Sequence, residues 1–278
     1  MQVKTYCYRF SSEHCYVCPM TSSTQRPLIL VTNDDGVTAK GILSLVKAVM
    51  PLGDVVVVAP DKPQSGMGHA VTINGILRFG SVTFPEDVQA YSCTGTPVDC
   101  VKMAIYRVLH RKPDLLVSGI NHGANSSINV IYSGTMSAAV EGAVEGIPSV
   151  GFSLLNSDVD ADFDASMFFA RKVCEEIIAN GMPEGICLNV NIPKGNLDTI
   201  QGIKICRQAK AYWQDTFDHR KDPSGNDYYW LMGEFKNFDH GEDTDEWALK
   251  HNFVSVVPVH YDLTAYHVIS NLQQWNLQ

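Results

Sequence analysis

The sequence predicts an α/β fold of the Rossmann-like type, in which a mostly parallel sheet lies between two layers of helices. From residue 27 to about residue 193, short apolar runs alternate with amphipathic helical segments. This alternation is typical of βαβ units, which cover both faces of a sheet with helices. After residue 193 polar loops separate strand-like runs. This change predicts an excursion of hairpin and helix attached to the main sheet.

The first strand and helix are predicted within residues 28–51. Residues 28–32 (LILVT) form a short apolar run that ends at the polar segment Asn33-Asp34-Asp35-Gly36, as expected for a buried strand followed by a loop. Apolar residues then recur at i, i+3, i+4 and i+7 up to Pro51: Ile42, Leu45, Val46 and Val49. This spacing predicts an amphipathic helix that ends before the proline.

The same alternation continues to residue 190. Strands are predicted at residues 54–60, 115–118, 148–153 and 186–190, and helices at residues 97–109, 135–145 and 166–179. The valines of residues 55–58 suit a buried parallel strand. Pro97 suits a first helical turn, and Asn180-Gly181 suits a helix end.

The two ends of the chain differ from this pattern. In the last third, strands are predicted at residues 203–207, 228–234 and 253–258, with a final helix at residues 263–272. We expect the region from about residue 194 to serve in oligomer contacts. Residues 1–26 carry three of the eight cysteines and no periodic apolar pattern. We expect them to be a disordered extension or an annotation artefact, with Met20 a candidate start, and assign them no function.

Composition limits the classes of partner. The formal net charge is −9, which argues against binding a nucleic-acid polymer, because phosphate backbones are held by clustered lysine and arginine. No run approaches the roughly 18 apolar residues of a membrane span. Among the cysteines only Cys15 and Cys18 have metal-ligand spacing, and no second pair completes a site. Reduced thiols in a cytoplasmic protein are therefore expected.

Four polar segments end predicted strands or open a helix: residues 33–36, 61–69, 118–125 and 132–135. In open parallel sheets, ligands bind at the carboxyl ends of the strands. Adjacent carboxylates at such an end, Asp34 and Asp35, suit a hard divalent cation that prefers oxygen ligands. The alternative is an ordinary turn, since Asp and Gly are common in turns. Ser65 and Asn121 lie at other predicted strand ends and favour the cation site.

The segment Ser133-Gly134-Thr135 suits an anion, because a helix start presents free N–H groups and glycine permits close approach. It is also an ordinary N-cap sequence, and the two interpretations are compatible. No GxxxxGK[ST], GxGxxG or GxSxG motif occurs, which disfavours P-loop NTPases, dinucleotide-binding folds and α/β-hydrolases. His69 and His122 lie in these loops, where proton transfer and a structural role both remain open.

Taken together, these segments resemble the SurE family of metal-dependent nucleotidases. The resemblance runs from about residue 27 to residue 264 and depends on the order and spacing of several motifs. The matching residues are Ile29 to Gly36, Ala59-Pro60-Asp61 with Ser65 and Gly68-His69, Thr94 to Val101, Ser118 to Asn121 with Gly123 and Asn125, Tyr132 to Thr135 with Ser137-Ala138-Ala139 and Glu141-Gly142, Asn189 to Pro193 and Val254-Ser255-Val256.

The resemblance implies a site and an activity. It assigns the metal ligands to Asp34, Asp35, Ser65 and Asn121, and the phosphate contacts to Asn125, Ser133, Gly134 and Thr135. It implies one Mg²⁺ or Mn²⁺ ion per subunit and hydrolysis of nucleoside 5′- and 3′-monophosphates, sometimes of short polyphosphate. It also implies dimers or tetramers that exchange C-terminal segments. One departure is Ser126-Ser127-Ile128-Asn129, where the family reads closer to Leu-Gly-x-Asp, and it bears on substrate preference.

Two mechanisms and two other protein classes stay open at this point. The nucleophile is either a water activated by the metal or the carboxylate of Asp34 or Asp35. The first alternative class is a non-catalytic nucleotide-binding regulatory protein, which would keep the phosphate site. The second is a structural oligomerisation protein built on the C-terminal third.

Overall fold

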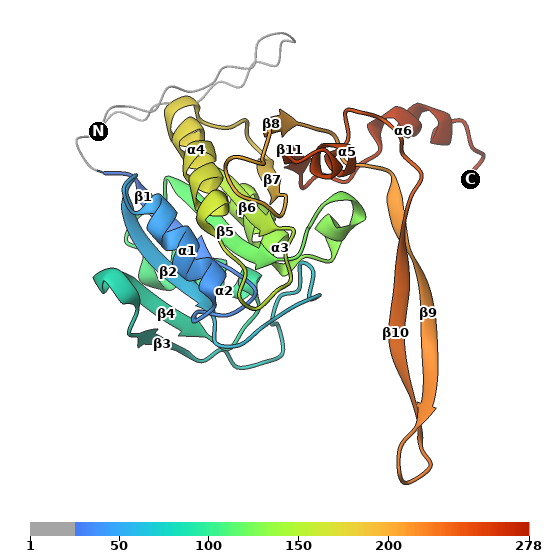
Figure 1. Cartoon of the computed structure of the whole chain (residues 1–278), viewed down its shortest axis with the longest axis horizontal. Helices are drawn as coiled ribbons and strands as arrows, with labels where there is room; N and C mark the ends of the chain where they lie inside the picture. Colours follow the sequence, from blue (N-terminus) through green and yellow to red (C-terminus); the bar gives the residue numbers. More distant parts are fainter. Residues whose placement is uncertain (1–25, 278) are drawn as a thin grey trace.

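The computed structural model describes residues 26–277 (Figure 1). The predicted extension, apart from Arg26, lies outside the described residues. Within them, nine strands form one sheet in the order β3-β4-β2-β1-β5-β6-β7-β11-β8. Five central strands run parallel: β1 (Leu28–Thr32), β2 (Asp54–Pro60), β5 (Leu115–His122), β6 (Ser149–Leu154) and β7 (Ile186–Ile192). The predicted mostly parallel sheet is confirmed.

The outer strands make the sheet mixed. At one edge β4 (Gln89–Cys93) runs parallel to β2, and β3 (Phe79–Val82) pairs antiparallel with β4. At the other edge β11 (Phe253–His260) lies antiparallel to β7, and β8 (Gly202–Ile205) runs parallel to β11. The final third of the chain therefore returns to the sheet and extends it.

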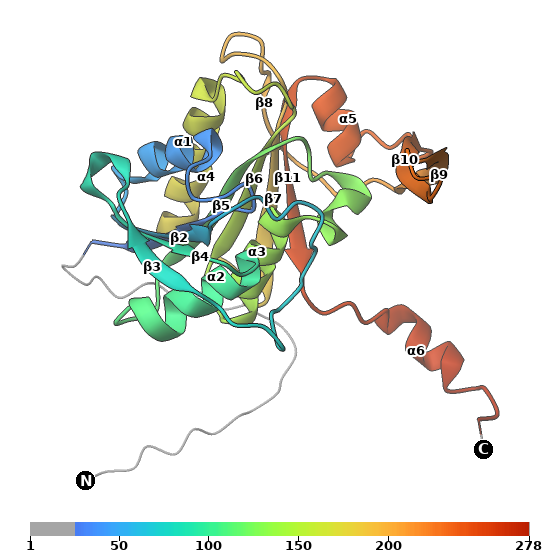
Figure 2. The same cartoon turned by 90° about the horizontal axis from the view of Figure 1, so that it is seen from below.

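Helices cover both faces of the sheet (Figure 2). Helices α1 (Lys40–Val49) and α4 (Asp164–Asn180) lie on one face, and α2 (Pro97–Met103) and α3 (Gly134–Val144) on the other. Strand β1 shows why both faces are apolar. Its alternate side chains point to opposite faces, so Ile29 and Val31 pack with the α1 and α4 residues, while Leu30 packs with α2. The predicted three-layer α/β arrangement is thus confirmed.

Several elements differ from the sequence prediction. Strands β3 and β4 were not predicted, because they are short and their segments are only partly apolar. Helix α2 ends at Met103 and continues as a π-helical turn, Ala104–Val108. A 3₁₀ turn, η3 (Ser127–Ile131), precedes α3. The last helix, α6, is Tyr266–Leu272, which begins three residues later than predicted.

The largest correction concerns the segment predicted as a polar loop between residues 207 and 228. It contains strand β9 (Ala211–Lys221), which pairs along its whole length with β10 (Asp227–Asn237). The residues of β9 are nearly all exposed, so the strand lacks the half-buried alternation that identifies a strand from sequence. A short helix, α5 (Asp245–Lys250), also lies in a region predicted as loop.

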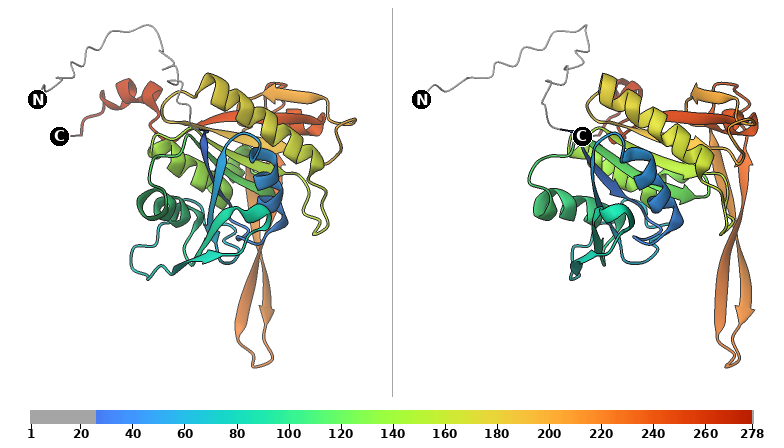
Figure 3. Two further views of the ribbon diagram at one scale, coloured as in Figure 1. Left: turned by 90° about the vertical axis from the view of Figure 1, so that its left-hand side faces the viewer. Right: turned by 60° about the vertical axis from the view of Figure 1, so that its left-hand side comes forward.

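The β9–β10 hairpin extends away from the main body, and α6 also lies apart from it (Figures 1 and 3). Large apolar side chains of the hairpin are exposed to solvent in the single chain: Phe217, Tyr229, Trp230, Leu231 and Met232. A two-stranded hairpin on its own is marginally stable in water. Patches of this kind mark interaction surfaces. No helix within residues 26–277 has both the length and the apolar character needed to cross a bilayer.

Candidate functional site

The candidate site lies where the strand order reverses. Strand β1 has β2 on one side and β5 on the other, and ligands of open α/β sheets bind at such a point beyond the carboxyl ends of the strands. Thr32, at the end of β1, pairs with Ser118 of β5. Asp34 follows the end of β1, and Asn121 lies near the carboxyl end of the neighbouring β5, where it pairs with Ser153 of β6.

Asp34 contacts the start of α3 and the loop after β2. Its Oδ1 accepts a hydrogen bond of 2.5 Å from the Thr135 hydroxyl, and its carbonyl oxygen accepts one of 2.7 Å from the Gln64 N–H. A Cβ atom at Gly134 would lie only 2.7 Å from the Cβ of Asp34. The structure therefore brings Asp34, Gly134 and Thr135 together, although they are about a hundred positions apart in the sequence.

Burial disfavours the charged forms of both carboxyls. It raises the pKa of Asp34 to about 6, against the hydrogen bond from Thr135 and with a further rise from the charge of Asp35. Burial also raises the pKa of Asp35, while His122 lowers it through its charge and its backbone. A cation next to these groups would favour their ionised forms.

Several buried oxygens at this place have no hydrogen-bond partner within the described residues. They include Asp35 Oδ2 and Asn33 Oδ1, together with the hydroxyl of Thr32 at the end of β1 and that of Ser118, its partner in β5. Buried polar atoms are normally paired, and unpaired ones call for an explanation. A hard cation that takes oxygen ligands supplies one. Asn33 is a candidate that the sequence reasoning missed, since its position within a turn gives no separate signal.

Asn121 and Ser65 differ in how firmly they are held. The amide of Asn121 donates to the carbonyls of His122 and Gly123, at 3.1 and 2.8 Å, which leaves its Oδ1 for a ligand. Ser65 is exposed, one residue after Gln64. Within residues 26–277 no three His, Cys, Asp or Glu side chains gather to hold a metal ion. A cation at this place must therefore use neutral oxygens beside the two carboxylates, and the residues present fit that requirement.

The start of α3 provides anion-binding groups. Ser133 is the N-cap, and its Oγ accepts the Met136 N–H at 3.0 Å, so its hydroxyl is used within the helix. The N–H groups of Gly134 and Thr135 are at the first turn, where an α-helix has no internal acceptor for them. The helix dipole adds positive potential at the same place. The capping and anion-binding interpretations therefore both fit the geometry.

Asn125 is buried and fixed by three hydrogen bonds. Its Nδ2 donates to Ser153 Oγ at 2.7 Å, its N–H donates to Asn191 Oδ1 at 2.7 Å, and its carbonyl accepts from Asn189 Nδ2 at 2.8 Å. Asn189 and Asn191 are supporting residues that the sequence reasoning missed. Their signal was two amides spaced by two within an apolar strand, which places both on one face.

The departure from the SurE pattern lies next to Asn125. Ser127 has a φ of +53°, a conformation that glycine adopts freely and serine rarely does. The Asn129 Oδ1 accepts a hydrogen bond of 2.7 Å from the indole N–H of Trp213 on the hairpin. Ser126, the third differing residue, donates through its hydroxyl to Glu246 at 2.6 Å. The differing residues thus lie in a segment that contacts the C-terminal third of the chain.

A sequence profile described as Survival protein SurE matches residues 29–215. The chain belongs to the SurE family. A 5'-nucleotidase SurE of Flavobacterium psychrophilum is 58% identical over 91% of this chain and 98% of its own length. One of Flavobacterium johnsoniae is 59% identical over the same shares. The crystal structure of the SurE protein from Aquifex aeolicus is 39% identical, with a TM-score of 0.77 over 89% of this chain and 98% of that one.

A buried ionic contact ties the loop of residues 61–69 to α2 and α3. Glu141 of α3 is 3% exposed; it pairs with Lys102 of α2 through one oxygen and with His69 at 2.9 Å through the other. Burial opposes ionisation of Glu141, but the hydrogen bonds from His69 and Lys102 outweigh it and lower its pKa. Lys102 also lies 3.9 Å from Glu145. Glu141 thereby links α2, α3 and the loop of residues 61–69.

We expect Glu141→Gln to lower the free energy of unfolding by roughly 1–2 kcal/mol at pH 7, because it removes the buried negative charge that Lys102 pairs with and that His69 contacts through a hydrogen bond. A depressed carboxyl pKa stabilises the fold above the unfolded value and loses that effect as the pH falls through the folded value. The difference between wild type and variant should therefore shrink below about pH 4.5. Urea denaturation from pH 7 to pH 3.5 measures it, and a difference independent of pH would contradict the assignment.

Proposed function

We propose that this chain is a phosphomonoesterase that hydrolyses nucleoside 5′-monophosphates to nucleoside and phosphate, with one Mg²⁺ or Mn²⁺ ion per subunit. Nucleoside 3′-monophosphates and short-chain polyphosphate are proposed as further substrates. The 5'-nucleotidase name of its SurE relatives supports the substrate class. The observation that carries the metal is the pair of unpartnered buried oxygens, Asp35 Oδ2 and Asn33 Oδ1, beside a carboxylate joined to a helix start.

Each residue has a distinct part in this proposal. Asp34, Asp35, Ser65 and Asn121 hold the ion. When bound, it supplies positive charge against the phosphoryl oxygens and lowers the pKa of a water. The N–H groups of Gly134 and Thr135 bind phosphoryl oxygens, with Ser133 and Asn125 shaping their surroundings. The Thr135 hydroxyl orients Asp34 through its 2.5 Å hydrogen bond, so the metal side and the phosphate side are joined directly.

Removal of divalent ions tests this proposal. We expect protein treated with EDTA and then dialysed to hydrolyse AMP at less than about 1% of the untreated rate, because charge neutralisation at phosphorus is the main catalytic contribution expected of such a site. Added Mg²⁺ or Mn²⁺ should restore the rate. The measurement is the rate of phosphate release, with the metal content of each sample determined by elemental analysis. Undiminished turnover by metal-free protein would refute the metal site.

The non-catalytic alternative gives a different result in the same experiment. Metal-loaded protein would bind AMP, as measured by calorimetry, and release no phosphate. Binding of AMP without release of phosphate would favour a regulatory nucleotide-binding protein.

We further propose that the region from about residue 194 joins subunits into a homodimer or homotetramer with exchanged C-terminal segments. The exposed apolar residues of the hairpin support this, and so does a largely apolar groove of 670 Å³ in the main body. Val140 and Val144 of α3 and Val257 and Val259 of β11 are among the residues that line it. The exposed α6 carries Tyr266 and Ile269 of matching apolar character. The five described cysteines are all free and buried, which supports a cytoplasmic location.

We expect the double substitution Trp230→Asp and Leu231→Asp to reduce the assembly, because two charges would be desolvated in an apolar contact. Light scattering after size-exclusion chromatography measures the mass. Ile76→Asp is the matched control, because Ile76 is 84% exposed on another part of the molecule. A mass unchanged by the hairpin substitutions, or lowered equally by the control, would contradict the proposal.

A further inference from the structure

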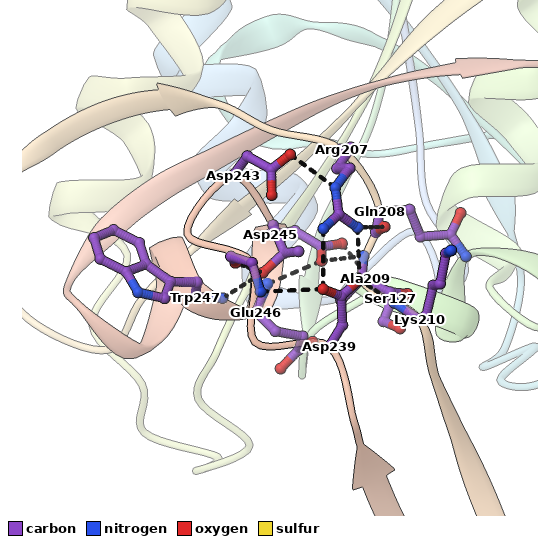
Figure 4. A network of polar contacts seen from close by, with 12 residues as sticks. Ser127, Arg207, Gln208, Ala209, Lys210, Asp239, Asp243, Asp245, Glu246 and Trp247 are labelled. Atoms are coloured by element: carbon purple, nitrogen blue, oxygen red, sulfur yellow. Dashed lines mark hydrogen bonds and ion pairs between the residues drawn. The ribbon is translucent and has the colours of Figure 1, made fainter.

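We propose that Asp245 is a positioning residue for phosphate binding: it fixes residues 125–129, the phosphate loop, to the base of the C-terminal hairpin. This inference rests on the proposed function, since it assumes that the loop faces substrate phosphate. It concerns a residue outside the candidate metal and phosphate ligands. Figure 4 shows the contacts from which it is built.

Asp245 bridges two segments with one carboxylate. It opens α5 and is fully buried. Its Oδ2 accepts a hydrogen bond of 2.7 Å from the N–H of Ser127, and its Oδ1 accepts one of 2.9 Å from the N–H of Ala209 (Figure 4). Oδ1 also accepts the N–H of Glu246 at 2.9 Å. The phosphate loop and the segment that leads into β9 are thus held by the same side chain.

The loop needs this support because of its backbone. Ser127 has the left-handed φ of +53° and is fully buried, and such a conformation in a residue other than glycine persists where surrounding contacts hold it. Besides its N–H bond to Asp245, its hydroxyl donates to the carbonyl of Ala209 at 2.8 Å. The two partners, Asp245 and Ala209, are themselves joined by a hydrogen bond at the hairpin base. Ser127 therefore takes its conformation from the C-terminal region.

The hairpin base is itself a fixed unit. Arg207 binds both carboxylate oxygens of Asp239, at 2.6 and 2.9 Å, and binds Asp243 at 2.8 Å (Figure 4). A bidentate arginine–carboxylate pair fixes relative orientation as well as distance. Arg207 precedes β9 and Asp239 follows β10, so this contact joins the two ends of the hairpin. The Trp213–Asn129 hydrogen bond of 2.7 Å ties the hairpin to the phosphate loop a second time.

Asp245 contacts the phosphate loop but none of the candidate metal ligands. Its carboxylate bonds to residues 127, 209 and 246, whereas the candidate metal ligands follow β1 and β2 or lie near the end of β5. The Asn125 end of the loop has its own support from Asn189 and Asn191 on β7. Loss of the Asp245 bridge should therefore loosen the Ser127 end of the loop, and with it phosphate binding, while the metal site keeps its geometry.

The test is Asp245→Asn, measured on the metal-loaded oligomer. The amide has the shape of the carboxylate but can accept only through one oxygen, so the N–H of Ser127 or of Ala209 meets an NH₂ group. We expect inhibition by inorganic phosphate to weaken about tenfold and KM for AMP to rise by a similar factor, as for one lost hydrogen bond to a charged acceptor. The affinity for Mn²⁺ without substrate should stay within about twofold, because the Asp245 contacts do not include the candidate metal ligands.

Asp243→Asn is the matched control. Asp243 lies two residues away, is exposed, and bonds through its side chain to Arg207 rather than to the phosphate loop. It should leave phosphate inhibition and KM unchanged. If Asp245→Asn does not fold, Ser127→Ala replaces it, since this change removes only the hydroxyl bond to Ala209. It should weaken phosphate inhibition severalfold and spare Mn²⁺ affinity.

Three results would overturn the proposal. They are unchanged phosphate inhibition in folded Asp245→Asn or Ser127→Ala, an equal loss of Mn²⁺ affinity, or an equal effect of Asp243→Asn. A wild type that neither needs a metal nor is inhibited by phosphate would instead count against the proposed function. The two failures are therefore told apart by the wild-type measurement alone.

Discussion

Asp34→Asn is expected to lower kcat for AMP at least about 100-fold without destabilising the fold. Changes in the groups that merely support metal ligands already cost 10–100-fold in many enzymes, and this substitution removes a charge from the proposed ligand set itself. The amide oxygen can still accept the hydrogen bond from Thr135. Burial raises the pKa of Asp34 to about 6, so its charge opposes folding of the metal-free protein at pH 7. The neutral variant should then unfold at an equal or higher urea concentration.

Steady-state kinetics with saturating Mn²⁺, together with urea denaturation of the metal-free protein, measures both quantities. Asp54→Asn is a suitable control, because Asp54 is an exposed carboxylate at the start of β2, at the other end of the sheet. Near-normal turnover by folded Asp34→Asn would remove Asp34 from the catalytic site.

Gly134→Ala is expected to have the second large effect. An added Cβ would lie 2.7 Å from the Cβ of Asp34 and 3.0 Å from its Oδ2, so the carboxylate must move. Gly134 is also the first residue of α3, so the change is made next to the N–H groups proposed to bind phosphate. We expect kcat/KM to fall about 100-fold or more, comparable with the loss of an oxyanion donor. The steric cost of roughly 1–3 kcal/mol is partly offset, since alanine favours a helix by about 1 kcal/mol.

Gly142→Ala separates this effect from general strain in α3. Its Cβ would meet Ser149 Oγ at 2.1 Å, on the sheet side of the same helix. We expect it to lower stability while the folded fraction keeps its kcat/KM. Equal activity loss in both variants, after correction for the folded fraction, would show that the helix as a whole rather than position 134 is responsible.

The parallel core could be predicted because its signals are local. The run of residues 28–32 and the valines of β2 are apolar on both faces, and helix α1 repeats its apolar residues at helical spacing. Strand β9 could not be predicted in this way. Within residues 26–277 it pairs with β10 alone, nearly all of its side chains are exposed, and nothing in its own sequence separates it from a loop.

The candidate site also contains residues that the sequence predicts and residues that it does not. Asp34, Asn121 and Thr135 follow or precede predicted elements, so the rule for parallel sheets places them at one edge before any coordinates are known. Asn33 lies in the same segment but gave no signal separate from its turn, and Asn191 and Asp245 lie outside the four polar segments. Their importance lies in contacts with segments far away in the sequence, and those pairings depend on strand order and on the path of the C-terminal third.

The separation of these contacts along the chain has a consequence for how the protein is made. The Asp34–Thr135 hydrogen bond joins positions 101 apart, and the Ser127–Asp245 bond joins positions 118 apart. During synthesis on the ribosome, Asp34 is therefore added to the chain long before Asp245, the residue proposed to fix the phosphate loop. Nascent chains that end before residue 245 should bind phosphate poorly, so hydrolytic capacity should arrive only near the completion of synthesis.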